Sequence, residues 1–119
     1  MAPSAPPHIR LLNLLGAIRD LAPFDLMTAE EDQLLRNLLV RWHDAKDITV
    51  SDIMKSMADV SHATAYRRLM ALRDKGMVRL RLDDTDKRVK LVEPTQLASD
   101  YAKHIHTALE QVTEANRAT

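Results

Sequence analysis

Residues 49 to 92 place two short helix patterns and two alternating segments in immediate succession. Thr49 and Asp52 have the spacing of a capping box, and Ser61 precedes a second apolar pattern that stops at Gly76. Residues 77–82 then alternate between apolar and basic, and 88–92 alternate again beyond an aspartate-rich turn. We therefore expect a helix-turn-helix, with helices at about 49–58 and 61–75, followed by a β-hairpin.

Further helical patterns flank this central segment. Apolar residues recur at spacings of three and four between 8 and 21, and Pro23 follows them. Thr28 and Glu31 form another capping box, which opens a helix to about His43. A final helix is expected over 95–115. Because the 119 residues include only two glycines, the fold class is mainly α with one small β-hairpin.

The length of the chain suits one ordinary domain. We expect residues 1–7, rich in proline and alanine, to form a disordered tail, and residues 8–119 to form a single domain. Within it, 8–22 is an N-terminal helix, 28–93 is the helix-turn-helix core with its hairpin, and 95–115 is the C-terminal helix.

Several functional classes lack support in this sequence. It has no cysteine, so disulfides and Cys-ligated metals are excluded. His104 and His106 point about 200° apart on a helix and cannot chelate one ion, so no metal and no cofactor is expected. No catalytic constellation or phosphate loop is present, which predicts a protein that is not an enzyme. The sequence has neither a secretory signal nor an apolar run long enough to cross a bilayer, so we expect a cytoplasmic protein.

The charge is balanced overall but unevenly distributed. Residues 62–90 contain nine basic and four acidic side chains, a net charge of +5, whereas the rest of the chain contains eight and thirteen, a net charge of −5. Duplex DNA is bound through lysine and arginine that displace condensed counterions. A basic segment coinciding with a helix-turn-helix therefore indicates double-stranded DNA as the partner.

The helix from 61 to 75 is the candidate recognition helix. Ala65, Leu69 and Leu72 form its buried stripe, so the opposite face is free for a major groove. We assign four residues to base edges: His62, Ala63, Tyr66 and Arg67. Thr64 and Arg68 are assigned to phosphates, and the helix starts, at Ser61 and at Thr49 with Ser51, offer backbone N–H groups to phosphates. The alternatives are that these are ordinary solvated residues and that Tyr66 is partly buried against the preceding helix.

Residues 28–102 resemble the winged-helix domain of the MarR family. The resemblance rests on the apolar and glycine positions Leu69, Leu72, Gly76 and Val78, on the turn Asp83–Arg88, and on 89–95. It implies a winged helix-turn-helix fold with dimerisation helices at both ends, and it implies that Arg88 enters the minor groove while Asp86 orients it and Lys87 lies beside them. The alternative is an ion pair that merely holds the turn. PadR-like and other compact winged-helix regulators share part of this layout.

The resemblance has departures and open points. Only one long helix follows the β-hairpin, which is the wing of a winged-helix fold. Arg68 stands where many members have an apolar residue. Control by a small phenolic or anionic effector is implied, although the sequence identifies none, and a ligand-free repressor remains an alternative. We expect a homodimer held by Leu11, Leu14, Leu15, Ile18, Tyr101, Ile105 and Val112.

The predicted function is sequence-specific binding of duplex DNA by a transcriptional regulator, in the form of a homodimeric repressor on a palindromic operator. The alternative is a winged-helix module that binds protein and does not read DNA. Such a module has no need of Arg67, Arg68 and Arg88 on one face.

Overall fold

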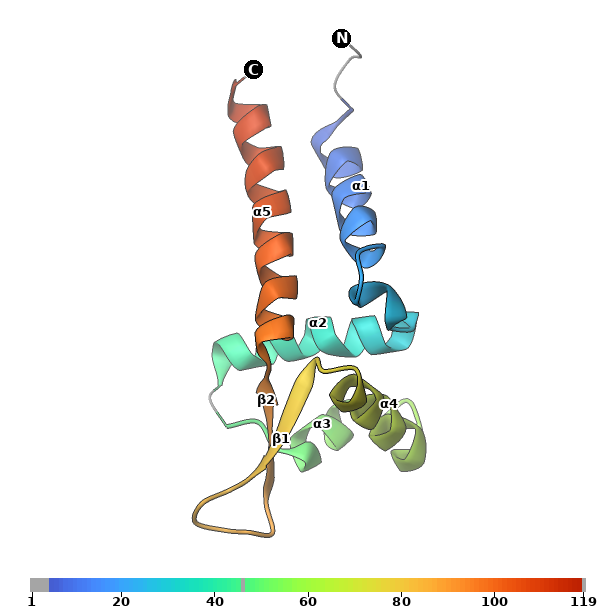
Figure 1. Ribbon diagram of the computed structural model, residues 1–119, viewed down its shortest axis with the longest axis vertical. Helices are drawn as coiled ribbons and strands as arrows, with labels where there is room; N and C mark the ends of the chain where they lie inside the picture. The colour runs from blue at the N-terminus through green and yellow to red at the C-terminus, as the bar shows by residue number, and fades with distance from the viewer. Residues whose placement is uncertain (1–4, 46, 119) are drawn as a thin grey trace. The chain divides into compact units, whose positions relative to one another are not determined.

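The computed structural model describes residues 5–45 and 47–118, and Figure 1 shows its helices and its hairpin. In chain order the elements are α1 (Pro7–Arg19), the 3₁₀ helix η1 (Phe24–Leu26), α2 (Ala29–Asp44), α3 (Val50–Ser56), α4 (His62–Asp74), β1 (Val78–Leu82), β2 (Lys90–Pro94) and α5 (Gln96–Ala118). The predicted fold class, mainly α with a small β-hairpin, is confirmed. Most of the predicted 1–7 tail lies outside the described residues, and α1 already begins at Pro7.

The chain divides into two compact units. One contains the residues up to Leu26 together with those from Asp100 onward, and the other is Met27–Ser99. The second unit contains α2, α3, α4 and the hairpin, and therefore every residue that we assigned to DNA.

Side-chain caps start the helices of the Met27–Ser99 unit. The hydroxyl oxygens of Thr28 and Thr49 each accept a hydrogen bond from the backbone N–H three residues on, and the acidic side chain there bonds back. Both predicted capping boxes are thus confirmed. Ser61 caps α4 through the N–H of Thr64. At the other end of α4, Gly76 has φ +81°, a left-handed conformation that side chains with a Cβ seldom adopt.

The core of this unit joins all of its elements. The largest fully buried side chains are Leu35 and Leu38 from α2, Ile53 from α3, Leu69 and Leu72 from α4, Met77, and Val92 from β2, and Val78 from β1 is 2% exposed. The indole N–H of Trp42 donates a hydrogen bond to the Val92 carbonyl, 2.9 Å away, and so ties α2 to the hairpin. The recognition helix and the wing are therefore held on one scaffold.

The hairpin differs from expectation at one end. Its strands pair antiparallel, with Val78 opposite Pro94 and Leu82 opposite Lys90. The second strand begins at Lys90 and not at Arg88, because the Asp83 carboxylate and the Asp86 carbonyl accept turn hydrogen bonds from the backbone N–H groups of Asp86 and Val89. These bonds keep the turn closed for two residues longer than the alternation of apolar residues indicates.

The other unit combines α1 and η1 with most of α5. Its buried side chains include Ile18, Phe24, Tyr101, Ala108 and Val112. The rings of Phe24 and Tyr101 lie 4.8 Å apart, centroid to centroid, and Arg19 donates a hydrogen bond to the Phe24 carbonyl. This aromatic contact joins η1 to α5.

Candidate nucleic-acid interface

Helix α4 buries one face and exposes the other, as its sequence predicts. Ala65, Leu69 and Leu72 are at most 1% exposed, and they hold the helix against the core. The four side chains assigned to base edges, His62, Ala63, Tyr66 and Arg67, are all exposed. Tyr66 retains 38% of its surface, so it packs only partly against the protein.

A small hydrogen-bond network orders the first turn of this exposed face. The Ser61 hydroxyl donates to Oγ1 of Thr64 at 3.0 Å, and a guanidinium nitrogen of Arg67 donates to the same oxygen at 3.3 Å. Arg67 thus lies back over the helix start while Arg68 is half-buried. Thr64 is consequently a positioning residue for Arg67 in addition to its predicted phosphate contact.

The hairpin turn fixes Arg88 with its side chain in solvent. One carboxylate oxygen of Asp86 accepts from the backbone N–H and Nε of Arg88, both at 3.1 Å, and the other accepts from Nη2 at 3.2 Å. The Arg88 side chain is nevertheless 91% exposed. The Arg88 guanidinium, and then its backbone N–H, hold the pKa of Asp86 below its ordinary value, so the pair stays ionised at neutral pH.

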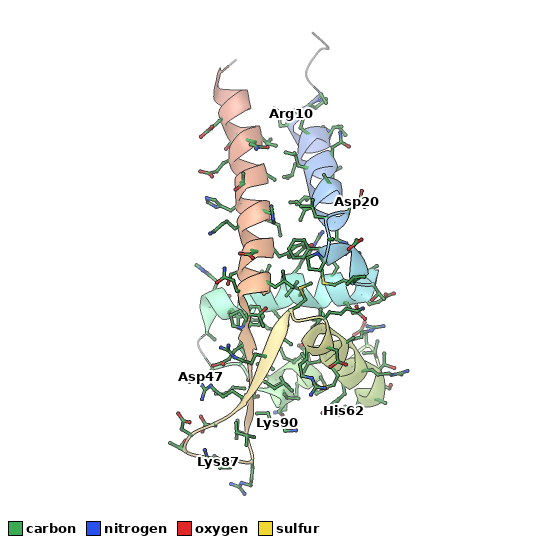
Figure 2. All side chains as sticks on the ribbon, in the orientation of Figure 1. Arg10, Asp20, Asp47, His62, Lys87 and Lys90 are labelled. Carbon is green, nitrogen blue, oxygen red and sulfur yellow. The ribbon has the colours of Figure 1, made fainter. Side chains whose placement is uncertain are left out.

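A second ion-pair cluster stiffens the strands behind the turn. Arg79 on β1 bonds one carboxylate oxygen of Glu93 on β2, and Arg81 bonds the other at 3.0 Å. The hydrogen bond from Arg81 is the main cause that keeps the pKa of Glu93 below its ordinary value. Both arginines are therefore occupied within the hairpin, unlike Lys87 and Lys90, which Figure 2 shows farther along it.

A hollow of about 290 Å³ lies where the start of α3 meets the hairpin. It is lined by Thr49, Val50 and Ser51 from one side and by Arg88, Val89 and Lys90 from the other. The backbone N–H of Thr49 already donates to the Asp52 carboxylate, so a phosphate contact by Thr49 has only its hydroxyl available, whereas Ser51 is exposed. Lys90 adds a cation that the sequence-based assignment missed, although it belongs to the basic segment.

The residues predicted for dimerisation all lie in the unit that contains α1 and η1. Leu11, Leu14, Leu15 and Ile105 are half-buried, whereas Ile18, Tyr101 and Val112 are buried within this chain. The latter three pack inside the protomer, so a second copy would meet different side chains. The sequence-based assignment overlooked the exposed apolar residues Leu12 (62%) and Leu109 (49%). Both lie next to residues of the apolar helical pattern, and this position in the sequence could have identified them.

The two histidines of α5 make separate contacts. The ring of His104 lies edge-on to Phe24, with centroids 5.9 Å apart, and His106 bonds Glu110. Across residues 5–45 and 47–118, no three acidic or histidine side chains are placed to hold a metal ion. Within the same ranges, no helix is both long and apolar enough to span a membrane.

Comparison of the structure with solved proteins gives a consistent result. No protein-family model and no curated protein matches the sequence. The structure is similar to Staphylococcus aureus MepR in a complex with DNA (17% identity, 93% of this chain and 75% of that one, TM-score 0.65). It is similar to a cysteine-to-serine mutant of Escherichia coli MarR (25% identity, 87% of this chain and 73% of that one, TM-score 0.56). It is also similar to Bordetella bronchiseptica BpsR (19% identity, 91% of this chain and 74% of that one, TM-score 0.53). The chain therefore has the winged helix-turn-helix fold of the MarR-like regulators to which it is similar.

Proposed function

We propose that this chain is a transcriptional repressor that binds duplex DNA sequence-specifically as a homodimer on a palindromic operator. The observation that carries the proposal is the wing. Asp86 holds the Arg88 guanidinium through two hydrogen bonds and the Arg88 backbone N–H through a third, and it still leaves the side chain almost wholly exposed, in the same unit as the exposed face of α4. A guanidinium held in solvent contributes little to folding, but it is preorganised for the negative potential of a narrow minor groove.

The exposed face of α4 supplies the major-groove contacts of the proposal. His62, Ala63, Tyr66 and Arg67 are positioned for base edges, and an arginine can bond guanine O6 and N7 as a fork. Ser61, Thr64 and Arg68 would contact phosphates beside them, and Ser51 and Lys90 would do so at the start of α3. Lys87 would add a cation at the tip of the wing.

The homodimer is proposed from the apolar surface of the terminal helices. Leu12 and Leu109 are largely exposed, and Leu11, Leu14, Leu15 and Ile105 are half-buried around the same two helices. Apolar side chains of this number are typical of a subunit interface. Two copies related by a two-fold axis would present two recognition helices to successive turns of a palindrome.

The solved neighbours add two elements to the proposal. MepR was solved with DNA, and the study of BpsR concerns regulation of its DNA binding by 6-hydroxynicotinic acid. By analogy, we infer DNA as the partner of this chain, and control by a small effector is part of the proposal. Such a regulator acts in the cytoplasm and without catalysis.

The test is selection of bound duplexes from a random pool, followed by fluorescence anisotropy on the selected site at several salt concentrations. Arg88→Ala should weaken binding and lower the salt slope by about 0.9 per lost phosphate contact. The matched control is Lys103→Ala, which removes one exposed cation from α5 and should preserve the slope. Enrichment of no sequence, or equal binding by parent and Arg88→Ala at every salt concentration, would instead favour a protein-interaction module.

A further inference from the structure

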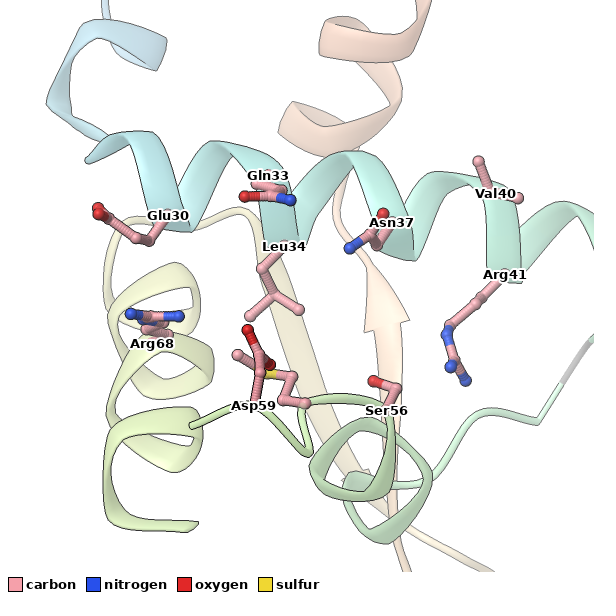
Figure 3. A pocket seen from close by; sticks show the side chains of 10 residues that line it. Glu30, Gln33, Leu34, Asn37, Val40, Arg41, Ser56, Asp59 and Arg68 are labelled. Atoms are coloured by element: carbon pink, nitrogen blue, oxygen red, sulfur yellow. The ribbon is translucent and has the colours of Figure 1, made fainter. Parts of the chain in front are cut away.

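A groove in the Met27–Ser99 unit takes no part in the proposed DNA contacts apart from Arg68. It has a volume of about 460 Å³ and lies between α2 and the segment that joins α3 to α4 (Figure 3). Leu34 and Met57 give it an apolar floor, and its polar lining includes Gln33 and Asn37. Its size falls within the range of small-molecule sites, about 300–1,000 Å³.

The charges along the groove are separated. At one end, Glu30 and Asp59 lie near Arg68, which leaves an excess of one negative charge. At the other end, Arg41 lies beyond Asn37, and no acidic residue of the groove lining lies beside it in Figure 3. The groove therefore has a negative and a positive end, with amide groups and apolar surface between them.

The two arginines of the groove differ from the rest of their unit. The guanidinium groups of Arg41 and Arg68 form no ion pair or hydrogen bond with any described residue, although both side chains are half-buried. The charge of Arg41 interacts electrostatically with the carboxylate of Asp52, but that carboxylate is hydrogen-bonded within the Thr49 cap. Every other arginine in Met27–Ser99 bonds a neighbouring side chain: Arg36, Arg67, Arg73, Arg79, Arg81 and Arg88. Arg68 nevertheless lies near the carboxylates of Glu30 and Asp59, so Arg41 is the partly desolvated cation that an anionic ligand group would complete.

We propose that this groove binds a small zwitterionic molecule, with its carboxylate on Arg41 and its amine on Asp59. Glu30 and Arg41 are three helical turns apart, about 16 Å along α2, and in Figure 3 the Glu30 side chain points away from Arg41 whereas Asp59 lies between them along the groove. The two charges of the ligand are therefore separated by a chain of several carbon atoms, which packs on Leu34 and Met57. An α-amino acid, whose charges adjoin, does not span the groove.

The experiment is a titration of the DNA-free, full-length protein with 6-aminohexanoate. Binding is monitored through the amide chemical shifts in ¹H–¹⁵N NMR spectra. Hexanoate and hexylamine are the matched probes, because each keeps the apolar chain and one of the two charges. We expect saturable shifts at Asn37 and Ser56 with 6-aminohexanoate and weaker binding of both single-charge probes. Equal binding of hexanoate, or shifts that do not saturate, would overturn the proposal.

Variants locate the two ends of the ligand. Arg41→Gln should weaken 6-aminohexanoate on the order of tenfold, the loss of one charge-assisted contact. Arg36→Gln, on the same helix but outside the groove, should leave binding unchanged. Asp59→Asn should weaken 6-aminohexanoate and leave hexanoate unaffected; an effect on both probes alike would contradict the placement of the amine. Because this titration contains no DNA, failure of the ligand to bind would not contradict the proposed DNA binding. Failure of the DNA-binding test would likewise not contradict the ligand site.

Discussion

The ion pair between Lys75 and Glu31 gives a sharp test of how α4 is held. Lys75 follows the last residue of α4, and its ammonium bonds Oε1 of Glu31, in the first turn of α2. The same Oε1 accepts the backbone N–H of Thr28 in the capping box. The side chains are 10% exposed for Glu31 and 28% for Lys75, so the pair is largely but not fully desolvated.

The size of the effect follows from this burial. An exposed ion pair contributes about 0–1 kcal/mol, whereas breaking a fully buried one costs about 3–5 kcal/mol. Lys75 can recover part of its hydration, so we expect a coupling of about 1–2 kcal/mol between the two residues. For a unit the size of Met27–Ser99, a loss of about 1–2 kcal/mol corresponds to a fall in Tm of roughly 4–16 °C when Glu31 alone is neutralised.

The assay is a double-mutant cycle in urea, with Glu31→Gln, Lys75→Met and the double variant. Glutamine keeps an oxygen for the Thr28 N–H, and methionine keeps the apolar stem, so the cycle isolates the charge interaction. Glu30→Gln, at an exposed neighbouring position, is the control and should change the free energy of unfolding little. A coupling within the additivity error of about 0.3–0.5 kcal/mol would refute the reasoning and place the pair with ordinary surface contacts.

Three further predictions concern the interfaces and the caps. Leu12→Glu should convert the proposed dimer to a monomer, as measured by light scattering, because it places a charge in the exposed apolar surface; an unchanged mass would contradict that interface. Asp86→Ala should lower DNA affinity even though it removes a negative charge, since it frees the Arg88 side chain; tighter binding in the anisotropy titration would mean that Asp86 only repels DNA. The backbone N–H of Thr49 is the main cause that lowers the pKa of Asp52, so this cap stabilises the fold at neutral pH and is lost as the pH falls below about 3.9. Thermal unfolding of Asp52→Asn should depend less on pH in that range, and an unaltered pH profile would argue against the cap.

Local chemistry explains why most of the fold could be predicted. The starts of α2, α3 and α4 are each set by a side chain that bonds a backbone N–H three residues away, and Gly76 ends α4 through its own backbone preference. The buried stripe of α4 follows from residue spacing alone. These interactions act over at most a few residues, so they can be predicted from the sequence.

The end of the hairpin could not be predicted in the same way. Apolar alternation suggested a strand from Arg88, but the hydrogen bonds of the Asp83–Asp86 turn delay pairing until Lys90. The sequence also left open whether the pair of Asp86 and Arg88 presents the arginine to DNA or merely holds the turn. The structure shows the ion pair with the guanidinium in solvent, an arrangement that depends on the turn conformation.

The sequence by itself determined the order of helices, the helix-turn-helix and its basic segment, because capping, periodicity and charge are properties of neighbouring residues. Only the tertiary structure decided that Tyr101 packs on Phe24 inside the protomer, that Lys90 lies beside the start of α3, and that Arg41 and Arg68 line one groove. Each of these joins residues distant in the chain. Such contacts are selected by how whole elements pack, and no local pattern of the sequence specifies that packing.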